Sequence, residues 1–151
     1  MKPKIQKVLV PLDGSAGSET VLPTVRELAG AEGATVRLLR VSPSPGSVIM
    51  DGRVIAYADQ EAARIEQEVL VYLRKVAAEL PGLEVEAAVR FGDPVEEIVK
   101  EAKSAGVDLI ALATHRRTGV SRLLKGSVAE QVERATAIPV LLVRYGEAAA
   151  A

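Results

Sequence analysis

Short apolar runs alternate along the chain with longer segments in which apolar residues recur every three or four positions. The short runs, rich in Val, Ile and Leu, predict strands, and the longer segments predict helices. The predicted strands cover residues 5–12, 34–41, 83–89, 107–113 and 139–144. The predicted helices run from Ser15 or Ser18 to Ala31 and over residues 58–80, 95–105 and 127–135. Residues 42–51, which begin Ser-Pro-Ser-Pro-Gly, predict a loop.

This alternation predicts a single α/β domain of the Rossmann-like type, with a parallel sheet and helices on both faces. The run 107–113 is apolar nearly throughout, as expected of a strand buried on both faces. We expect the domain to cover residues 1–146 and residues 147–151 to form a frayed tail. Ligands of such sheets bind at the carboxyl ends of the strands. Asp13 and the loop that begins at Thr114 follow two of these strands.

The composition argues against several classes of function. Cysteine is absent, which excludes disulfides and zinc–thiolate sites and favours a cytoplasmic protein. A single histidine, His115, excludes multi-histidine metal sites. The net charge of -1 argues against general nucleic-acid binding, and no apolar run approaches the length of a membrane span. We therefore expect neither a nucleic acid nor a membrane as partner.

Residues 108–128, DLIALATHRRTGVSRLLKGSV, combine a buried strand, a basic loop and a Gly-Ser pair that opens a helix. The first turn of a helix attracts phosphate, because its N–H groups are unpaired and its dipole is positive there. The loop cations bind an anion or form a solvated face; they are Arg116, Arg117, Arg122 and Lys125. Ser127 and Glu130 have the spacing of a capping box, which is sufficient by itself to explain both residues.

The sequence contains no recognisable catalytic set. Neither a Gly-x-x-x-x-Gly-Lys-Ser/Thr loop nor a Gly-x-Gly-x-x-Gly after the first strand is present. No serine nucleophile or orienting carboxylate is evident around His115, so we expect this residue at the surface or in contact with a ribose. Asp13 can accept a hydrogen bond from a ribose hydroxyl or an adenine amino group, or cap the helix after Gly14, and these roles are compatible. We expect no enzyme, or at most a weak ATPase.

Taken as an ordered set, several segments resemble the universal stress protein family over almost the whole chain. They are KVLVPLDGS, RLLRVSPSP, VRFGDPVEEIVKEA, VDLIALATHRRTG, LLKGSVAEQV and IPVLLVR. The resemblance implies five parallel strands in the order 3-2-1-4-5. It also implies a homodimer that pairs through the fifth strand, Pro139–Arg144.

The ATP-binding branch of that family carries Gly, two residues, Gly, nine residues and then Gly-Ser or Gly-Thr. Counting back from Gly126-Ser127 places the two earlier glycines at Ala113 and Arg116, so this chain retains only the second half of the motif. The resemblance implies that adenine and ribose are surrounded by Pro11, Leu12, Asp13 and Val41. It implies that ribose and phosphates are contacted by Leu112, Ala113, His115, Arg116, Gly126, Ser127 and Val128.

The two replacements leave two functions open. Arginine at 116 would be strained by about 1–2 kcal/mol if a left-handed conformation were needed there, but its guanidinium is also the best phosphate partner among side chains. The first hypothesis is that the protein is a stress-response sensor or regulatory dimer that binds an adenine nucleotide, with ATP as the expected one. The alternative is a family member that has lost nucleotide binding and acts through dimerisation and protein partners. The sequence leaves open whether Mg²⁺ accompanies the phosphates.

Overall fold

The computed structural model describes residues 4–46, 48–115 and 127–146. Its centre is a parallel sheet of five strands in the order β5-β2-β1-β6-β7. These strands are β1 (Lys7–Pro11), β2 (Thr35–Ser42), β5 (Val85–Phe91), β6 (Leu109–His115) and β7 (Val140–Tyr145). The order is the predicted 3-2-1-4-5 once two short strands outside the sheet, β3 (Val48–Met50) and β4 (Arg53–Ala56), are left out of the numbering. The predicted fold is therefore confirmed.

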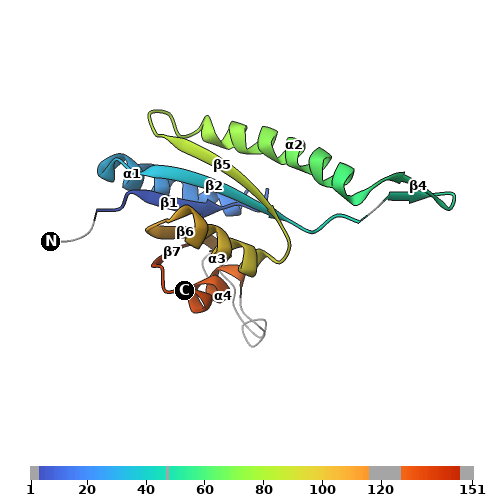
Figure 1. Ribbon diagram of the computed structural model, residues 1–151. Coiled ribbons are helices and arrows are strands. Elements are labelled where there is room, and N and C mark those ends of the chain that lie inside the picture. Colours follow the sequence, from blue (N-terminus) through green and yellow to red (C-terminus); the bar gives the residue numbers. More distant parts are fainter. Residues whose placement is uncertain (1–3, 47, 116–126, 147–151) are drawn as a thin grey trace.

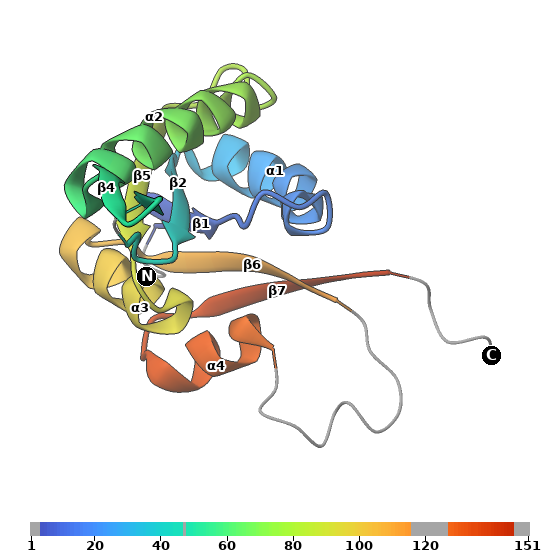
Figure 2. The ribbon, with the colours of Figure 1, turned by 90° about the vertical axis from the view of Figure 1, so that its right-hand side faces the viewer.

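Helices cover both faces of this sheet (Figures 1 and 2). On one face lie α1 (Leu22–Glu32), preceded by the 3-10 turn η1 (Ser18–Val21), and α2 (Ala58–Ala77). The other face is covered by α3 (Pro94–Ala105) and α4 (Val128–Ala135). Successive residues of β1 enter opposite cores, because Val8 and Val10 pack toward α1 and α2 and Leu9 packs toward α3 and α4. A central strand buried on both sides must be apolar along its buried part, and β1 is apolar from Val8 to Pro11.

The third helix begins and ends with the residues that the sequence indicates. The Asp93 carboxylate accepts a hydrogen bond from the Glu96 N–H at 3.0 Å, and Pro94 occupies the first turn. Gly106 ends the helix with a φ of 66°. The first predicted helix differs, because a 3-10 turn forms its start and neither η1 nor α1 has a side-chain cap. The other bounds lie within a few residues of those predicted.

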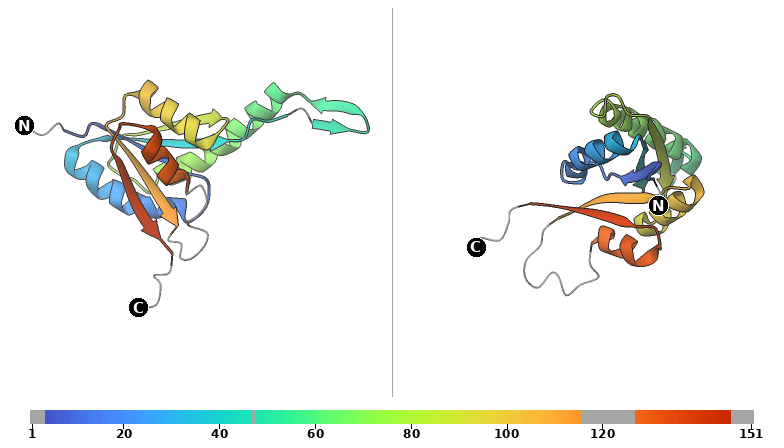
Figure 3. Two further views of the ribbon diagram at one scale, coloured as in Figure 1. Left: turned by 90° about the horizontal axis from the view of Figure 1, so that it is seen from below. Right: turned by 90° about the vertical axis from the view of Figure 1, so that its left-hand side faces the viewer.

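The prediction of a loop over residues 42–51 was wrong in its second half. Val48–Met50 (β3) pairs antiparallel with Arg53–Ala56 (β4) in a hairpin that projects from the domain next to the start of α2 (Figures 1 and 3). Its turn is Asp51-Gly52, with φ values of 53° and 74°. Asp-Gly between apolar residues is the strongest short-range signal for such a hairpin, so the information was present in the sequence.

The structure bears on the expectation about membranes but not on the one about the chain end. None of the helices in the described ranges has the length and apolar character that crossing a membrane requires. The expected tail, residues 147–151, lies outside the described residues. All five strands of the sheet and the helices on both of its faces belong to the described residues.

Candidate functional site

A cavity of about 360 Å³ opens at the carboxyl ends of the strands, on the α3–α4 side of the sheet. This is the edge at which α/β sheets bind ligands, and the volume is within the range of small-molecule sites. Nine of the residues predicted from the sequence line it: Pro11, Leu12, Asp13, Val41, Leu112, Ala113, His115, Ser127 and Val128. The other two, Arg116 and Gly126, lie outside the described residues, as do the remaining cations of the predicted basic loop.

The cavity also has walls that the prediction of site residues did not include. These residues are Ser18, Pro94, Ile98, Thr114, Ala129 and Tyr145. Pro94, Ile98 and Ala129 follow from the fold, since they belong to α3 and α4, which cover this face of the sheet. Thr114 and Tyr145 are the last or nearly last residues of β6 and β7. Position at a strand end was the available signal for these two.

Asp13 presents one carboxylate oxygen to the protein and leaves the other free among the described residues. Its Oδ1 accepts hydrogen bonds from the Ser15 N–H at 2.8 Å and from the Ser15 hydroxyl at 2.6 Å. The Asp13 N–H donates to the Ser18 hydroxyl at 3.3 Å. This is the Asx-type turn that was one of the two roles considered for Asp13. Because Oδ1 is held, Oδ2 is available to accept a hydrogen bond from a ligand.

The same contacts keep the Asp13 carboxyl ionised. Partial burial acts to raise the pKa of Asp13, but hydrogen bonding by Ser15 and Ser18 and the positive charge of Arg40 outweigh that effect. The pKa therefore lies below its ordinary value. An ionised carboxylate only accepts hydrogen bonds. Asp13 is thus suited to a ligand that brings a hydroxyl or amino donor.

The N-terminus of α4 meets the cavity next to the end of β6. Ser127 is the N-cap, and its hydroxyl accepts a hydrogen bond from the Glu130 N–H at 3.1 Å. The buried Thr114 hydroxyl donates to the Ser127 hydroxyl at 3.3 Å. Val128 and Ala129, in the first turn, line the cavity. The first turn of a helix carries partial positive charge, so this part of the wall favours an anion.

His115 and Tyr145 form an aromatic wall at the ends of β6 and β7. Their ring centroids are 5.1 Å apart, and the rings meet edge to face at 89°. The Tyr145 ring lies against Gly17, where any Cβ would overlap it. Within the described part of the chain, no carboxylate or serine hydroxyl hydrogen-bonds to His115. The histidine therefore has a packing partner here and no partner that would make it a general base.

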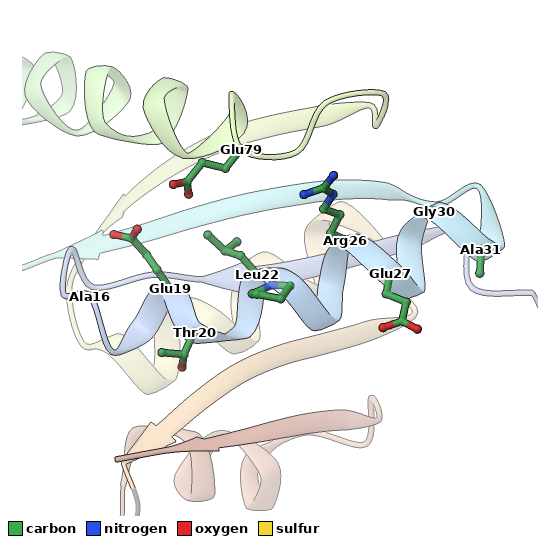
Figure 4. Close-up of a pocket in the computed structure, with 10 residues that line it drawn as sticks. Ala16, Glu19, Thr20, Leu22, Arg26, Glu27, Gly30, Ala31 and Glu79 are labelled. Carbon is green, nitrogen blue, oxygen red and sulfur yellow. The ribbon is translucent and has the colours of Figure 1, made fainter. Parts of the chain in front are cut away.

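A second, larger groove of about 760 Å³ runs along the outer side of α1. Figure 4 shows Glu79 extending toward α1 from the segment after α2, with Glu19 and Arg26 on the opposite wall. The groove contains none of the predicted site residues and lies beside α1, which covers the face of the sheet opposite the α3–α4 side where the cavity opens. Three carboxylates and one arginine are its charged residues, and the rest of its lining is small, apolar or uncharged, so we do not assign the nucleotide site there.

Comparison with known families is decisive for identity. A family model described as the universal stress protein family matches residues 4–144. The chain belongs to the universal stress protein family. Among curated relatives, YxiE of Bacillus subtilis is 30% identical over 146 residues, which cover 91% of this chain and 98% of that protein. Universal stress protein MJ0577 of Methanocaldococcus jannaschii is 29% identical over 153 residues, with coverage of 92% and 94%.

Solved structures share the fold of this universal stress protein. The structure of MJ0577 superposes with a TM-score of 0.76 at 26% identity, covering 97% of this chain and 100% of that one. A universal stress protein in complex with cAMP gives a TM-score of 0.71 at 22% identity, with coverage of 94% and 98%. One from Archaeoglobus fulgidus in complex with dAMP gives 0.63 at 22% identity, with coverage of 93% and 99%. The latter two establish the common fold, and their nucleotides are properties of those proteins.

Proposed function

We propose that this universal stress protein binds an adenine nucleotide, ATP in particular, and acts as a stress-response sensor or regulatory dimer in the cytoplasm. The observation that carries the proposal is the cavity that contains both Asp13, whose Oδ2 accepts no hydrogen bond from the described residues, and the N-terminus of α4. Related proteins of the same fold were crystallised with cAMP and with dAMP, which supports adenine nucleotide as the ligand class.

The described walls fit a nucleoside and its phosphates in different places. Apolar side chains suit the faces of a base, and those that line the cavity include Val41, Ile98 and Leu112. Asp13 Oδ2 would accept a hydrogen bond from a ribose hydroxyl or the adenine amino group. The first turn of α4 would receive the phosphates, as helix N-termini commonly do. We expect Arg116 and Gly126 to complete the phosphate site.

We propose that bound ATP is hydrolysed slowly or not at all. The described lining residues supply no paired acid and base that would activate a water molecule. No group of three His, Cys, Asp or Glu side chains within the described ranges is placed to hold a metal ion. If Mg²⁺ accompanies the nucleotide, phosphate oxygens and water would supply most of its ligands, as is usual for this ion.

The proposed regulatory unit is a dimer that pairs through β7. This strand is at the edge of the sheet, and an open apolar edge must be covered to avoid uncontrolled association. The side chains of Val140, Leu141, Leu142 and Val143 are all partly exposed in the single chain. A second copy of β7 would cover them.

A second candidate function is supported by Ala113. This residue lines the cavity at a position where the ATP-binding branch carries glycine, so its methyl group occupies space near the proposed ribose and phosphates. A chain that had lost nucleotide binding would act through dimerisation and protein partners alone.

Two measurements on the purified protein separate these functions. Mass spectrometry of the small molecules released by denaturation should detect an adenine nucleotide. Calorimetric titration should then give saturable binding of ATP, weaker binding of adenosine, and much weaker binding of GTP as the control for the base. A dimer that releases no nucleotide and gives no heat with ATP would contradict the first function and favour the second.

A further inference from the structure

Arg40 reaches the loop that presents Asp13 from the side of the sheet opposite the cavity. It precedes Val41 on β2, and because neighbouring residues of a strand point to opposite faces, Val41 lines the cavity while Arg40 lies on the α1–α2 side. A Cβ at Gly14 would overlap Arg40 Nη1 and would lie 3.1 Å from its Cζ. Gly14 also has a φ of +88°, which L side chains rarely adopt. The guanidinium therefore packs directly on the Gly14 backbone.

Two other elements hold Arg40 in this position. Its Cζ lies 5.8 Å from the centroid of the Tyr72 ring on α2, which is a cation–π distance. The Tyr72 hydroxyl donates a hydrogen bond to Glu19 Oε2 of η1 at 2.8 Å. Burial and the Glu19 carboxylate raise the pKa of Tyr72, so the hydroxyl remains a donor. β2, α2 and η1 are thereby joined behind the Asp13–Gly14 turn.

One donor of the half-buried Arg40 side chain has no hydrogen-bond partner in the described part of the chain. Its Nε is buried and has no hydrogen-bond partner among the described residues. Arg37 on the same strand is different, since it pairs with Glu86 at 2.8 Å and with Glu101 at 2.5 Å. A buried donor without an acceptor is unfavourable for stability. The presence of Arg40 despite this unpaired donor indicates that the side chain has a role other than packing in the core.

We propose that Arg40 is the positioning residue of the nucleotide site, bracing the Gly14 backbone from behind so that Asp13 Oδ2 faces the ligand. The role rests on the proposed function, because it concerns the same cavity, but Arg40 itself does not line that cavity. The positive charge of Arg40 also helps to lower the pKa of Asp13, so it favours the ionised carboxylate that the proposed ligand contact requires. Arg40 thus supports the backbone of the Asp13–Gly14 turn and contributes to the positive electrostatic potential at the Asp13 carboxylate.

The test uses one variant that removes both the charge and the planar fork of the guanidinium, and a second that removes only the fork. Arg40→Met keeps the length of the side chain and loses both, whereas Arg40→Lys keeps the charge. Arg37→Met is the matched control, since it removes an arginine of the same strand that does not contact the loop. The pKa of Asp13 is measured without nucleotide from its carboxyl ¹³C shift, together with the amide signals of Gly14 and Ser15. Calorimetry gives the ATP and adenosine affinities.

Arg40→Met should raise the pKa of Asp13, shift both amide signals, and weaken ATP and adenosine binding by the same factor, about fivefold. Arg40→Lys should restore most of the pKa but not the amide signals. Other titratable groups around the carboxyl remain in every variant: Glu19 on η1, Tyr72 on α2, His115 on β6 and Tyr145 on β7. Arg37→Met should change neither the Asp13 pKa nor the affinities, even if it lowers the melting temperature.

Gly14→Ala supplies a second approach to the same contact, because its methyl group must displace the guanidinium. It should reproduce the rise in the Asp13 pKa that Arg40→Met causes. An Asp13 pKa and amide signals that stay unchanged in folded Arg40→Met would overturn the positioning role. Altered signals in Arg40→Met, in a protein whose wild type binds no adenine nucleotide, would instead overturn the proposed function and leave the bracing of the turn established.

Discussion

The Thr114 hydroxyl donates a hydrogen bond to the Ser127 hydroxyl at 3.3 Å, which joins the end of β6 to the N-cap of α4. Ser127 in turn accepts the Glu130 N–H. The two bonds place the first turn of α4 in the wall of the cavity, next to the strand end. The proposed phosphate position therefore depends on a buried threonine as well as on the Gly-Ser pair.

Thr114→Val should test this link, because valine has nearly the same shape and lacks the hydroxyl. We expect the free energy of unfolding to fall by about 1 kcal/mol, the typical contribution of one hydrogen bond. ATP affinity should fall more than adenosine affinity, since α4 faces the phosphates. Thr35→Val is the control. Thr35 is the first residue of β2, and its hydroxyl makes only a 3.5 Å contact with the Glu84 carboxylate. Urea denaturation and calorimetry supply the measurements, and equal losses for ATP and adenosine would contradict the phosphate assignment.

Asp13→Ala should weaken nucleotide binding at least tenfold, which corresponds to about 1.4 kcal/mol. The variant loses the free Oδ2 acceptor and also the Ser15 bonds, so a stability loss on the order of 1 kcal/mol is expected as well. Asp108→Ala is the matched control: its carboxylate accepts the N–H groups of Gln6 at 2.8 Å and Lys7 at 3.0 Å at the start of β1. Control and variant should lose similar stability, but only Asp13→Ala should lose affinity. Unchanged calorimetric affinity in folded Asp13→Ala would move the nucleotide site elsewhere.

The sequence was sufficient for the sheet, and the physical reason is local, whereas most of the residues expected around the cavity were implied by the family resemblance. Each strand is an apolar run that ends at a polar or glycine-containing turn, so the strand ends, and with them Asp13, can be located by reading along the chain. Ser127 is located by the Gly-Ser pair and by its capping-box spacing to Glu130. Parallel strands place those ends at one edge. The nine described residues that were predicted for the site all meet there.

The parts that could not be predicted depend on contacts between distant segments. The glycines at 14 and 17 do not form a Gly-x-Gly-x-x-Gly loop; the structure shows that they leave room for the Arg40 and Tyr145 side chains. Nothing near these glycines in sequence indicates that an arginine on β2 and a tyrosine on β7 would reach them. The hairpin at Asp51-Gly52 is a different case, since its turn signal was local and was not used.

The proposed dimer predicts a mass twice the 15.9 kDa of one chain by sedimentation at micromolar concentration. If β7 pairs with its symmetry mate, its outward N–H groups become hydrogen-bonded and should exchange slowly with solvent. On dilution to the monomer, exchange at β7 should accelerate while exchange at the central strand β1 stays slow. A monomeric mass, or a dimer in which β7 amides exchange quickly, would exclude this interface.

Glu101→Gln should destabilise the protein and change how its stability depends on pH. Glu101 is 5% exposed, and its two oxygens accept hydrogen bonds from Arg37 at 2.5 Å and Arg90 at 2.6 Å. Burial acts to raise the pKa of Glu101, but Arg90 and Arg37 outweigh that effect, so the pKa lies below its ordinary value of 4.5. The pair therefore stabilises the fold above about pH 4.5, and that stability is lost as the pH falls through the lower, folded pKa.

We expect Glu101→Gln to lower the free energy of unfolding at pH 7 by about 2–3 kcal/mol, because two guanidinium groups lose a charged acceptor. The difference from wild type should shrink toward acid pH. Glu68→Gln is the control: it removes a carboxylate that also pairs with an arginine, Arg64, but whose side chain is 65% exposed. Exposed pairs contribute little, so denaturation curves of this variant should match those of wild type. A difference for Glu101→Gln that persists unchanged at low pH would contradict the ion-pair origin.

The decisive residue for nucleotide binding is Arg116, one of the two predicted site residues outside the described ranges. If Arg116 binds phosphate, Arg116→Ala should weaken ATP binding and leave adenosine binding nearly unchanged. The preference for ATP over adenosine should also decrease with added salt, because exposed charges are screened. If Arg116 instead blocks the site, Arg116→Gly should strengthen binding, most clearly together with Ala113→Gly, since the backbone could then approach the phosphates. We expect Arg116 to act as a ligand, and tighter ATP binding in Arg116→Gly than in wild type would refute that expectation.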